Sequence, residues 1–277
     1  MTADSRQVYC HMDIGTDKPT PEQQRLVPHH MINIVLPDEP YTLVMYSDQA
    51  TNEIEAILKR GRIPVLAGGT PLYVNAITEG WVIPRVEPDL EFRQALEQEA
   101  LAQGSEALHR RLSALDPAAA GKILSSNTRR IIRALEVIEI TGQPMSAQQG
   151  KQTPAYRQLH IGLRCERSEN YRRIDERVEE QFRRGLVEEV ASLHQRGYAF
   201  DLPSMSGLGY RQVGDLLLGR ATLDETKQRI KWDTHAFVRH QANWFRRATG
   251  AQWLDVTEAD PTEKALLLAK KFLGGQD

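Results

Sequence analysis

The sequence predicts an α/β fold, in which a parallel sheet is flanked by helices and carries an all-helical insertion. Two short apolar runs predict the sheet: residues 31–36 (MINIVL) precede a proline, and residues 63–70 (IPVLAGGT) contain a glycine pair. Between them, residues 43–60 have apolar positions at helical spacing. Strand, helix and strand in this order favour a right-handed crossover between parallel strands. The insertion is predicted from residues 88–150, where helical patterns follow one another without a strand.

Further elements follow from the same signals along the chain. Gly61 can end the first long helix. Residues 158–163 (QLHIGL) and 252–256 (QWLDV) are further strand candidates. Helical patterns cover residues 168–197 and a long segment after Gly219.

The helical insertion has recognisable helix ends. Gly104 separates two helical patterns, Ser105 opens the second, and Asn127 can cap a third that stops at Gly142. We therefore predict two domains. Residues 1–87 and 151–277 form an α/β core with C-terminal helices, and residues 88–150 form the helical insertion.

Composition narrows the class of protein. The 277 residues include 26% charged residues at a formal net charge of −2, so any nucleic-acid binding must come from a local basic patch. Cys10 and Cys165 are too few and too far apart for a disulfide framework, which suits a reducing compartment. Apolar runs stay shorter than the roughly 18 residues of a membrane span. We expect a cytoplasmic protein without a membrane partner.

Several motifs favour an anion or nucleic-acid site, and each has a structural alternative. Thr70 follows a glycine pair at the end of a predicted strand, where ligands collect in α/β folds, although a packing turn explains the glycines equally well. Arg129, Arg130 and Arg133 lie near one helical face that suits phosphates, or they form a solvated face neutralised by neighbouring glutamates.

Two later motifs have the same ambiguity. Arg173 and Arg177 are one helical turn apart and could both reach one diphosphate, but the acidic residues around them equally suggest a salt-bridged surface helix. The small-residue loop 206–211 (SGLGYR) could approach a base closely, or it could be a turn between helices. The histidines and cysteines lack the spacing of a zinc site, so we predict no structural metal.

In combination, these stretches resemble the tRNA dimethylallyltransferase family, also called tRNA isopentenyltransferases or the IPP transferase family. The resemblance covers essentially the whole chain, and its motifs occur in the family's order: ADSRQVY, MDIGTDKPT, VPHHMI, DEPYT, GRIPVLAGGTPLYVNAI, RRIIRALEV, PSMSGLGYRQ and NWFRR.

The resemblance implies transfer of a dimethylallyl group from its diphosphate to N6 of the adenine 3′ of the anticodon. The tRNAs concerned read codons that begin with U. The target base would be extruded into a channel, as is usual for chemistry on a stacked base. The implied partners are the tRNA anticodon stem-loop and dimethylallyl diphosphate, and we expect a monomer. The insertion would be a swivelling domain that contacts tRNA.

Residue roles follow from the matched motifs. Asp4 matches the general base, Thr70 matches a channel residue, and Arg177, with Arg173 as the less certain candidate, matches the arginine that steadies the diphosphate. The positions that match tRNA contacts are Asp4, Ser5, Arg6, Gln7, Thr70, Arg93, Arg129, Arg130, Ile131, Ile132, Arg133, Ser206, Gly207, Leu208, Gly209, Tyr210 and Arg211.

The resemblance also implies a P-loop NTPase-like parallel core whose first strand and P-loop are missing from this sequence. That loop would hold the diphosphate and help to place Mg²⁺, the cofactor expected from the family. Without it we expect poor catalysis, an unpaired sheet edge and low stability. Two local departures from the family pattern are Cys10-His11, in place of Arg-Gly, and Arg239-His240-Gln241, in place of Lys-Arg-Gln.

Three other functions remain open at this point. A nucleotide kinase-like phosphotransferase would need the same absent loop and would leave the basic insertion helix unexplained. An adenylate dimethylallyltransferase would use the same chemistry on free AMP to make a cytokinin. A non-catalytic remnant would retain only tRNA binding.

Overall fold

The computed structural model describes residues 1–154, 156–246, 250–257 and 260–274. It has an α/β fold with small sheets and many helices. Backbone contacts divide the chain into two compact units. The first, called the core unit, comprises Met1–Thr42, Asp48–Val74 and Tyr156–Asp277, and the second, called the helical unit, comprises Leu43–Ser47 and Asn75–Ala155.

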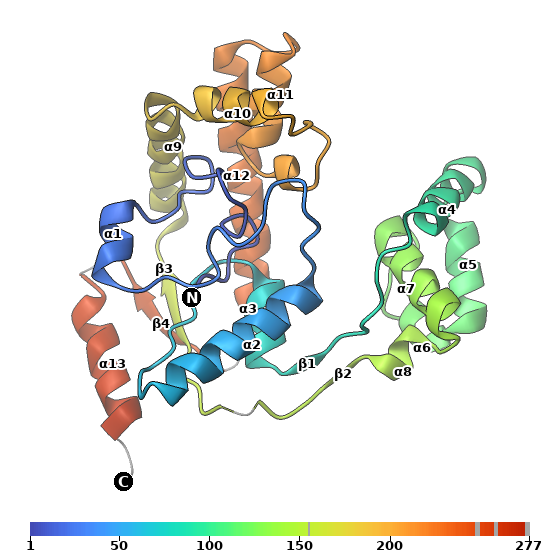
Figure 1. Ribbon diagram of the computed structural model, residues 1–277, viewed down its shortest axis with the longest axis horizontal. Helices are drawn as coiled ribbons and strands as arrows, with labels where there is room; N and C mark the ends of the chain where they lie inside the picture. Colours follow the sequence, from blue (N-terminus) through green and yellow to red (C-terminus); the bar gives the residue numbers. More distant parts are fainter. Residues whose placement is uncertain (155, 247–249, 258–259, 275–277) are drawn as a thin grey trace. The chain divides into compact units, whose positions relative to one another are not determined.

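The core unit contains a two-stranded parallel sheet (Figure 1). Strand β3 (Ile161–Arg164) pairs with β4 (Gln252–Asp255), so that Ile161 lies opposite Gln252. Both segments were predicted as strands, and both are confirmed. Leu254 is the buried side chain of these two strands.

The predicted strands at residues 31–36 and 63–70 are wrong as regular strands. Each segment makes a single parallel bridge, Val35 with Tyr9 and Ala67 with Thr2. Residues 31–36 cannot extend further because Met31 (φ 63°) and Asn33 (φ 54°) lie in the left-handed region, which a strand does not tolerate. The helix predicted between the two segments is confirmed as α2 (Leu43–Lys59).

Four helices of the core unit, α9 to α12, pack through apolar faces. Contacts join α9 to α10 and α12, and α11 to α10 and α12 (Figure 1). The apolar side chains that these helices bury include Ile174, Val178, Val190, Leu193, Val213 and Ile230. The helices have these bounds: α1 Pro21–Leu26, α9 Arg167–Arg183, α10 Leu186–Gln195, η1 Ser204–Ser206, α11 Tyr210–Leu217, α12 Leu223–Phe245 and α13 Thr262–Gly274. Helix α3 spans Pro71–Thr78, and the division between the two units falls within it, after Val74.

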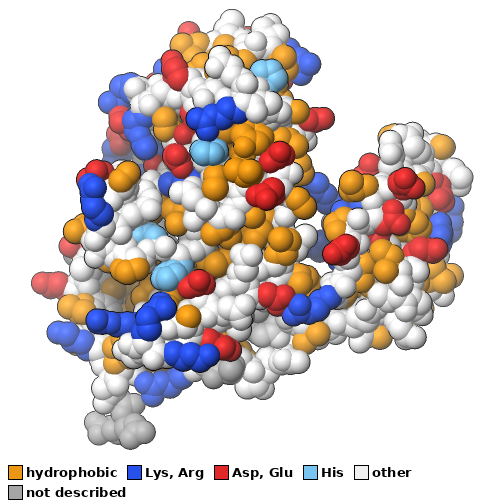
Figure 2. Space-filling view, viewed as in Figure 1, with side chains coloured by type: hydrophobic (Ala, Val, Ile, Leu, Met, Phe, Trp, Pro, Cys, Tyr) orange, Lys and Arg blue, Asp and Glu red, His pale blue; other side chains and the backbone are white. Residues whose placement is uncertain are grey.

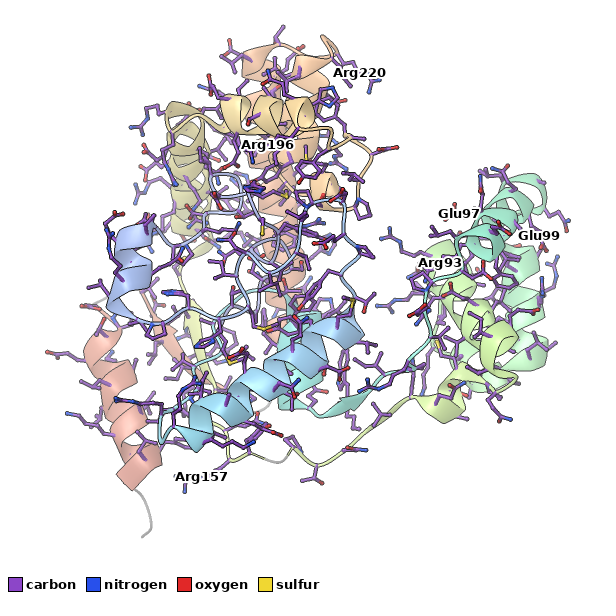
Figure 3. The ribbon with its side chains drawn as sticks, viewed as in Figure 1. Arg93, Glu97, Glu99, Arg157, Arg196 and Arg220 are labelled. Carbon is purple, nitrogen blue, oxygen red and sulfur yellow. The ribbon has the colours of Figure 1, made fainter. Side chains whose placement is uncertain are left out.

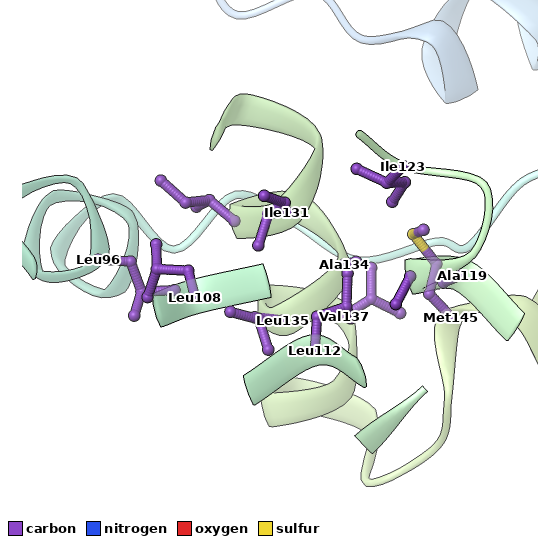
Figure 4. Close-up of a cluster of buried hydrophobic side chains, with 12 residues drawn as sticks. Leu96, Leu108, Leu112, Ala119, Ile123, Ile131, Ala134, Leu135, Val137 and Met145 are labelled. Atoms are coloured by element: carbon purple, nitrogen blue, oxygen red, sulfur yellow. The ribbon is translucent and has the colours of Figure 1, made fainter. Parts of the chain in front are cut away.

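The helical unit has its own hydrophobic core (Figure 4). Its predicted helix ends are confirmed: the Asn127 side chain accepts a hydrogen bond from the Arg130 amide, and Gly142 ends the helix with φ 66°. The core side chains include Leu96, Leu108, Leu112, Ile131, Leu135 and Val137. The elements are β1 Trp81–Val82, α4 Leu90–Gln103, α5 Ser105–Leu115, α6 Pro117–Ala120, α7 Thr128–Thr141, α8 Met145–Gln148 and β2 Gly150–Lys151.

In the helical unit, strands β1 and β2 pair antiparallel, so that Trp81 lies opposite Lys151 and Val82 opposite Gly150. This pair brings together the two chain segments that enter and leave the helices. Within the described residues, no helix is both long enough and apolar enough to cross a membrane.

Candidate active site

The site begins at Asp4, whose carboxylate organises the turn that follows it. One oxygen, Oδ1, accepts hydrogen bonds from the backbone amides of Arg6 (2.8 Å) and Gln7 (3.4 Å). This is an Asx turn, which explains why an aspartate fits at the point where the extended segment ends. Asp4 is half-buried, and its second oxygen, Oδ2, makes no hydrogen bond with the residues that the structure describes.

Thr70 lies against the same turn. Its Oγ1 accepts a hydrogen bond from the Ser5 amide (3.0 Å), and its own amide donates to the Ala3 carbonyl (3.0 Å). Gly68 permits this approach, because a Cβ there would lie 2.3 Å from the Ala3 carbonyl oxygen. The two motifs predicted to form one site are therefore adjacent, although they are far apart in sequence.

The Arg6 guanidinium joins the Asp4 turn to the segment around η1. It donates to the carbonyls of Pro203 (2.7 Å) and Ser204 (3.2 Å) and to the Ser206 hydroxyl (3.2 Å). The predicted tRNA-contact loop 206–211 thus starts beside the Asp4 turn. Within that loop, Tyr210 is 1% exposed, so its side chain is a packing residue and offers little surface to a ligand.

Residues 13–18, from the motif MDIGTDKPT, form a loop that contacts the turn through Gln7. The Gln7 side-chain amide donates to the carbonyls of Thr16 (3.2 Å) and Asp17 (3.4 Å). The buried ammonium group of Lys18 donates to the Tyr9 carbonyl (2.5 Å), the Asp13 carboxylate (2.8 Å) and the Asn33 side chain (2.5 Å). Sequence reasoning gave Lys18 no role, since nothing in its neighbourhood predicts that a lysine is buried.

The two arginines proposed for the diphosphate lie in different surroundings. Arg177 Nε is 3.4 Å from the Asp17 carboxylate, so it is connected to Gln7 through the 13–18 loop. Arg173 Nε is 2.7 Å from the Glu169 carboxylate, on its own helix. Both side chains keep substantial exposure, 58% and 43%. Arg177 is therefore the arginine with a contact to the elements around Asp4.

Another contact, which sequence reasoning missed, reaches this site from α12. The Gln241 side-chain amide donates to the Gly69 carbonyl (2.7 Å), directly before Thr70. Arg239, the first residue of the departure from the family pattern, donates to the Tyr171 hydroxyl (3.0 Å). Arg247, the last residue of the motif NWFRR, lies outside the described residues.

In the helical unit, the predicted tRNA-contact positions divide into buried and exposed residues. Ile131 and Ile132 are in the hydrophobic core, with 0% and 3% exposure, so these side chains are not available to a ligand. Arg129 and Arg130 are exposed at the start of α7. On the face that Figure 2 shows, basic, acidic and apolar side chains are interspersed over this unit.

Arg93 and Arg133 share one buried acid. Glu136 is fully buried, and its carboxylate accepts two hydrogen bonds from Arg93 (2.7 and 2.8 Å) and one from Arg133 (2.5 Å). Arg93 lies in the first turn of α4 (Figure 3). Both side chains are about one-third exposed, and through Glu136 they connect the start of α4 to α7.

Metal-binding side chains do not gather anywhere in the described part of the chain, since no group of three or more His, Cys, Asp or Glu residues could hold an ion. Mg²⁺ does not require such a group, because it usually keeps several waters and is held by one or two carboxylates together with substrate phosphates. Mg²⁺ stays an expectation of the resemblance.

The geometry defines an α/β protein with a half-buried carboxylate in a polar, glycine-lined site and a separate helical unit with exposed arginines. Comparison with known proteins gives the family. The model of the family described as IPP transferase matches residues 7–248, and the chain belongs to this family. Curated relatives include the tRNA dimethylallyltransferases of Thermomicrobium roseum (50% identical, covering 93% of this chain and 78% of the relative) and Roseiflexus castenholzii (49%, covering 98% and 89%).

Solved structures agree with this assignment. The full-length tRNA isopentenylpyrophosphate transferase of Bacillus halodurans is 38% identical with a TM-score of 0.70, and the match covers 99% of this chain and 86% of that one. A eukaryotic dimethylallyltransferase that acts on tRNA has a TM-score of 0.80 at 22% identity, a likeness in fold alone, over 99% of this chain and 72% of that one.

Proposed function

We propose that this protein transfers a dimethylallyl group from dimethylallyl diphosphate to N6 of the adenine 3′ of the anticodon of tRNA. Family membership and the names of the relatives support prenylation of tRNA. The observation that carries the proposal is Asp4: one carboxylate oxygen caps its turn, and the other has no hydrogen-bond partner within the described residues.

In the proposed reaction, the N6 nitrogen attacks C1 of the dimethylallyl group. The carbon–nitrogen bond forms while the bond from C1 to the diphosphate oxygen breaks, and the diphosphate leaves with that electron pair. Asp4 Oδ2 accepts the proton that N6 loses, as a general base. A base already fixed by its turn needs little reorganisation, which favours this role.

Arg177 is the proposed diphosphate contact, because its guanidinium group is exposed and faces the loop next to Gln7. A cation there would offset the negative charge that develops on the leaving group. Thr70 and Ser5 are proposed to line the site beside the adenine, and Arg129 and Arg130 to contact tRNA phosphates from the helical unit. A P-loop NTPase-like core and Mg²⁺ are part of the proposal only through the resemblance to the family.

Variants of Asp4 test the proposal. Asp4→Asn keeps an oxygen that can cap the turn but removes the base, so transfer should fall by a factor of about 100 or more, whereas tRNA affinity should change by less than about twofold. Asp38→Asn, at an exposed position, is the matched control and should behave as wild type. The measurements are transfer of labelled dimethylallyl to tRNA and filter binding of the same tRNA.

The alternatives predict different results in the same assays. An enzyme that uses free AMP would label AMP and leave tRNA unlabelled. A tRNA-binding remnant would bind tRNA without transfer in the wild-type chain. If the Asp4→Asn variant transfers the dimethylallyl group at the wild-type rate, Asp4 is not the general base.

A further inference from the structure

The Glu189 side chain, in α10, accepts hydrogen bonds from the 13–18 loop and from Tyr210 with both of its carboxylate oxygens. Its Oε2 accepts from the backbone amides of Asp13 (2.9 Å) and Ile14 (2.7 Å), and its Oε1 accepts from the Gly15 amide (3.1 Å) and the Tyr210 hydroxyl (2.7 Å). Three successive amides that converge on one anion form a nest, a backbone arrangement that favours negative charge.

We propose that Glu189 is a positioning residue for the transfer reaction, which acts by fixing the 13–18 loop and thereby placing Gln7 and Arg177. The inference rests on the proposed function. It adds Glu189, which lies outside the sequence motifs that suggested that function, to the residues that support the reaction. Glu189 touches neither substrate in this proposal, and its effect passes through the loop.

The loop connects Glu189 to two site residues. Its carbonyls at Thr16 and Asp17 accept both hydrogen bonds from the Gln7 side chain (3.2 and 3.4 Å), and the Asp17 carboxylate lies 3.4 Å from Arg177 Nε. A shift of the loop would therefore displace Gln7, a predicted tRNA contact, together with Asp17, the partner of Arg177. Displacements of about 1 Å at such groups are large on the scale of catalytic geometry.

A carboxylate suits this position better than an amide would. An ionised carboxylate only accepts hydrogen bonds, and all four of its neighbours here are donors. Tyr210 stays a donor because burial, together with the nearby charge of Glu189, raises the pKa of its phenol well above the ordinary value. The contact is also close, since a Cβ on Gly15 would lie 2.5 Å from the Tyr210 ring.

The chain supplies a matched control one residue away. Glu188 has the same charge on the same helix, but its side chain is exposed. Glu188→Gln and Glu189→Gln therefore change the net charge equally, and only the second places an –NH₂ donor against backbone N–H groups. The glutamine retains one acceptor oxygen, which limits the disturbance and favours a folded variant.

The first measurement is amide hydrogen exchange of the full chain. In Glu189→Gln, exchange at residues 13–15 should be about tenfold faster than in wild type, because the acceptor of these amides is weakened. Glu188→Gln should match wild type there. Peptides from β3 and β4 serve as internal standards, and unchanged exchange in them shows that the fold is retained.

The second measurement is prenyl transfer to tRNA at saturating substrates, with tRNA affinity measured in parallel. We expect kcat to fall about tenfold in Glu189→Gln while the Kd for tRNA changes by less than about twofold. A residue that only stabilises the fold would not separate kcat from affinity at a temperature where every variant is folded.

Two outcomes overturn the proposal. Unchanged exchange at residues 13–15 in Glu189→Gln means that the carboxylate does not fix the loop, whatever the activity of the wild-type chain. Faster exchange with wild-type kcat means that the contact is structural only. Failure of the proposed function is recognised separately, because it would be seen as absent transfer in the wild-type chain.

Discussion

Arg6 is the residue through which the Asp4 turn and the segment before α11 are joined. Its three hydrogen bonds end on acceptors 197 to 200 residues away in the sequence. The planar guanidinium group suits this task because its donors diverge at fixed angles, so one side chain can reach two carbonyls and a hydroxyl. A single ammonium group cannot span the same set.

We predict that Arg6→Lys lowers transfer about tenfold, since at least one charged hydrogen bond that aligns the turn is lost. Thermal unfolding should change little, because Arg6 lies at a surface where water can replace the lost partner. The transfer assay is the measurement, and Arg25→Lys on α1, whose arginine side chain is 71% exposed, is the control. A fall in the control of similar size would show a general effect of arginine replacement.

Glu136 determines how the helical elements of the insertion meet. It lies in α7 and accepts hydrogen bonds from Arg93 of α4, from Arg133 and from the Asp89 amide (2.8 Å). Burial alone raises the pKa of this carboxyl, but the hydrogen bonds from Arg93, Arg133 and Asp89 outweigh it and hold the pKa below the ordinary value of 4.5. The acid is therefore ionised in the folded unit at neutral pH.

This shift predicts an acid-sensitive helical unit. A carboxyl whose pKa is lower in the folded state stabilises that state above the unfolded-state pKa, and the contribution is lost as the pH falls toward the folded-state value. Stability should therefore decline below about pH 4.5. In Glu136→Gln the decline should be shallower, and the unit should already be about 3 kcal/mol less stable at pH 7.

Hydrogen exchange of α4 and α7 peptides, followed against pH in the full chain, measures this effect. Glu139→Gln is the matched control, because Glu139 lies on the same helix and is exposed. An unchanged pH profile in Glu136→Gln would assign the acid sensitivity to other carboxyl groups.

Elements with clear local signals, including the strands β3 and β4, could be predicted from the sequence, whereas contacts between side chains far apart in sequence could not. The Asn127 cap and the Gly142 stop of α7 depend on residues within a few positions, and both are confirmed. The segment 31–36 has a strand's composition, but its backbone amides at Asn33 and Ile34 donate to the distant Gln7 and Val8 carbonyls, and Met31 and Asn33 have positive φ, which no local pattern reveals. Glu189 was likewise missed, because the loop amides that it binds lie about 175 residues away in the sequence.

At the scale of the whole molecule, the net charge does not indicate whether the protein can bind tRNA, because binding depends on where exposed cations lie. The formal charge is −2, yet Arg129 and Arg130 are exposed together at the start of α7. Neighbouring arginines are already paired with Glu136, so these two are better placed to meet a phosphate backbone. Binding to a polyanion would then depend on a few local cations and would be sensitive to salt.

The salt dependence of tRNA binding can be dissected with Arg129→Ala. One lost phosphate contact should weaken binding about tenfold and reduce the slope of log affinity against log salt by about 1, because one fewer counterion is released. The rate of transfer at saturating tRNA should stay near wild type, since Arg129 is proposed to contact a tRNA phosphate and has no part in the proposed bond-forming step. Filter binding over a series of salt concentrations is the measurement. Arg60→Ala, which removes the same charge from an exposed site on the core unit, should leave the slope unchanged, and equal slopes in Arg129→Ala and wild type would exclude a phosphate contact at Arg129.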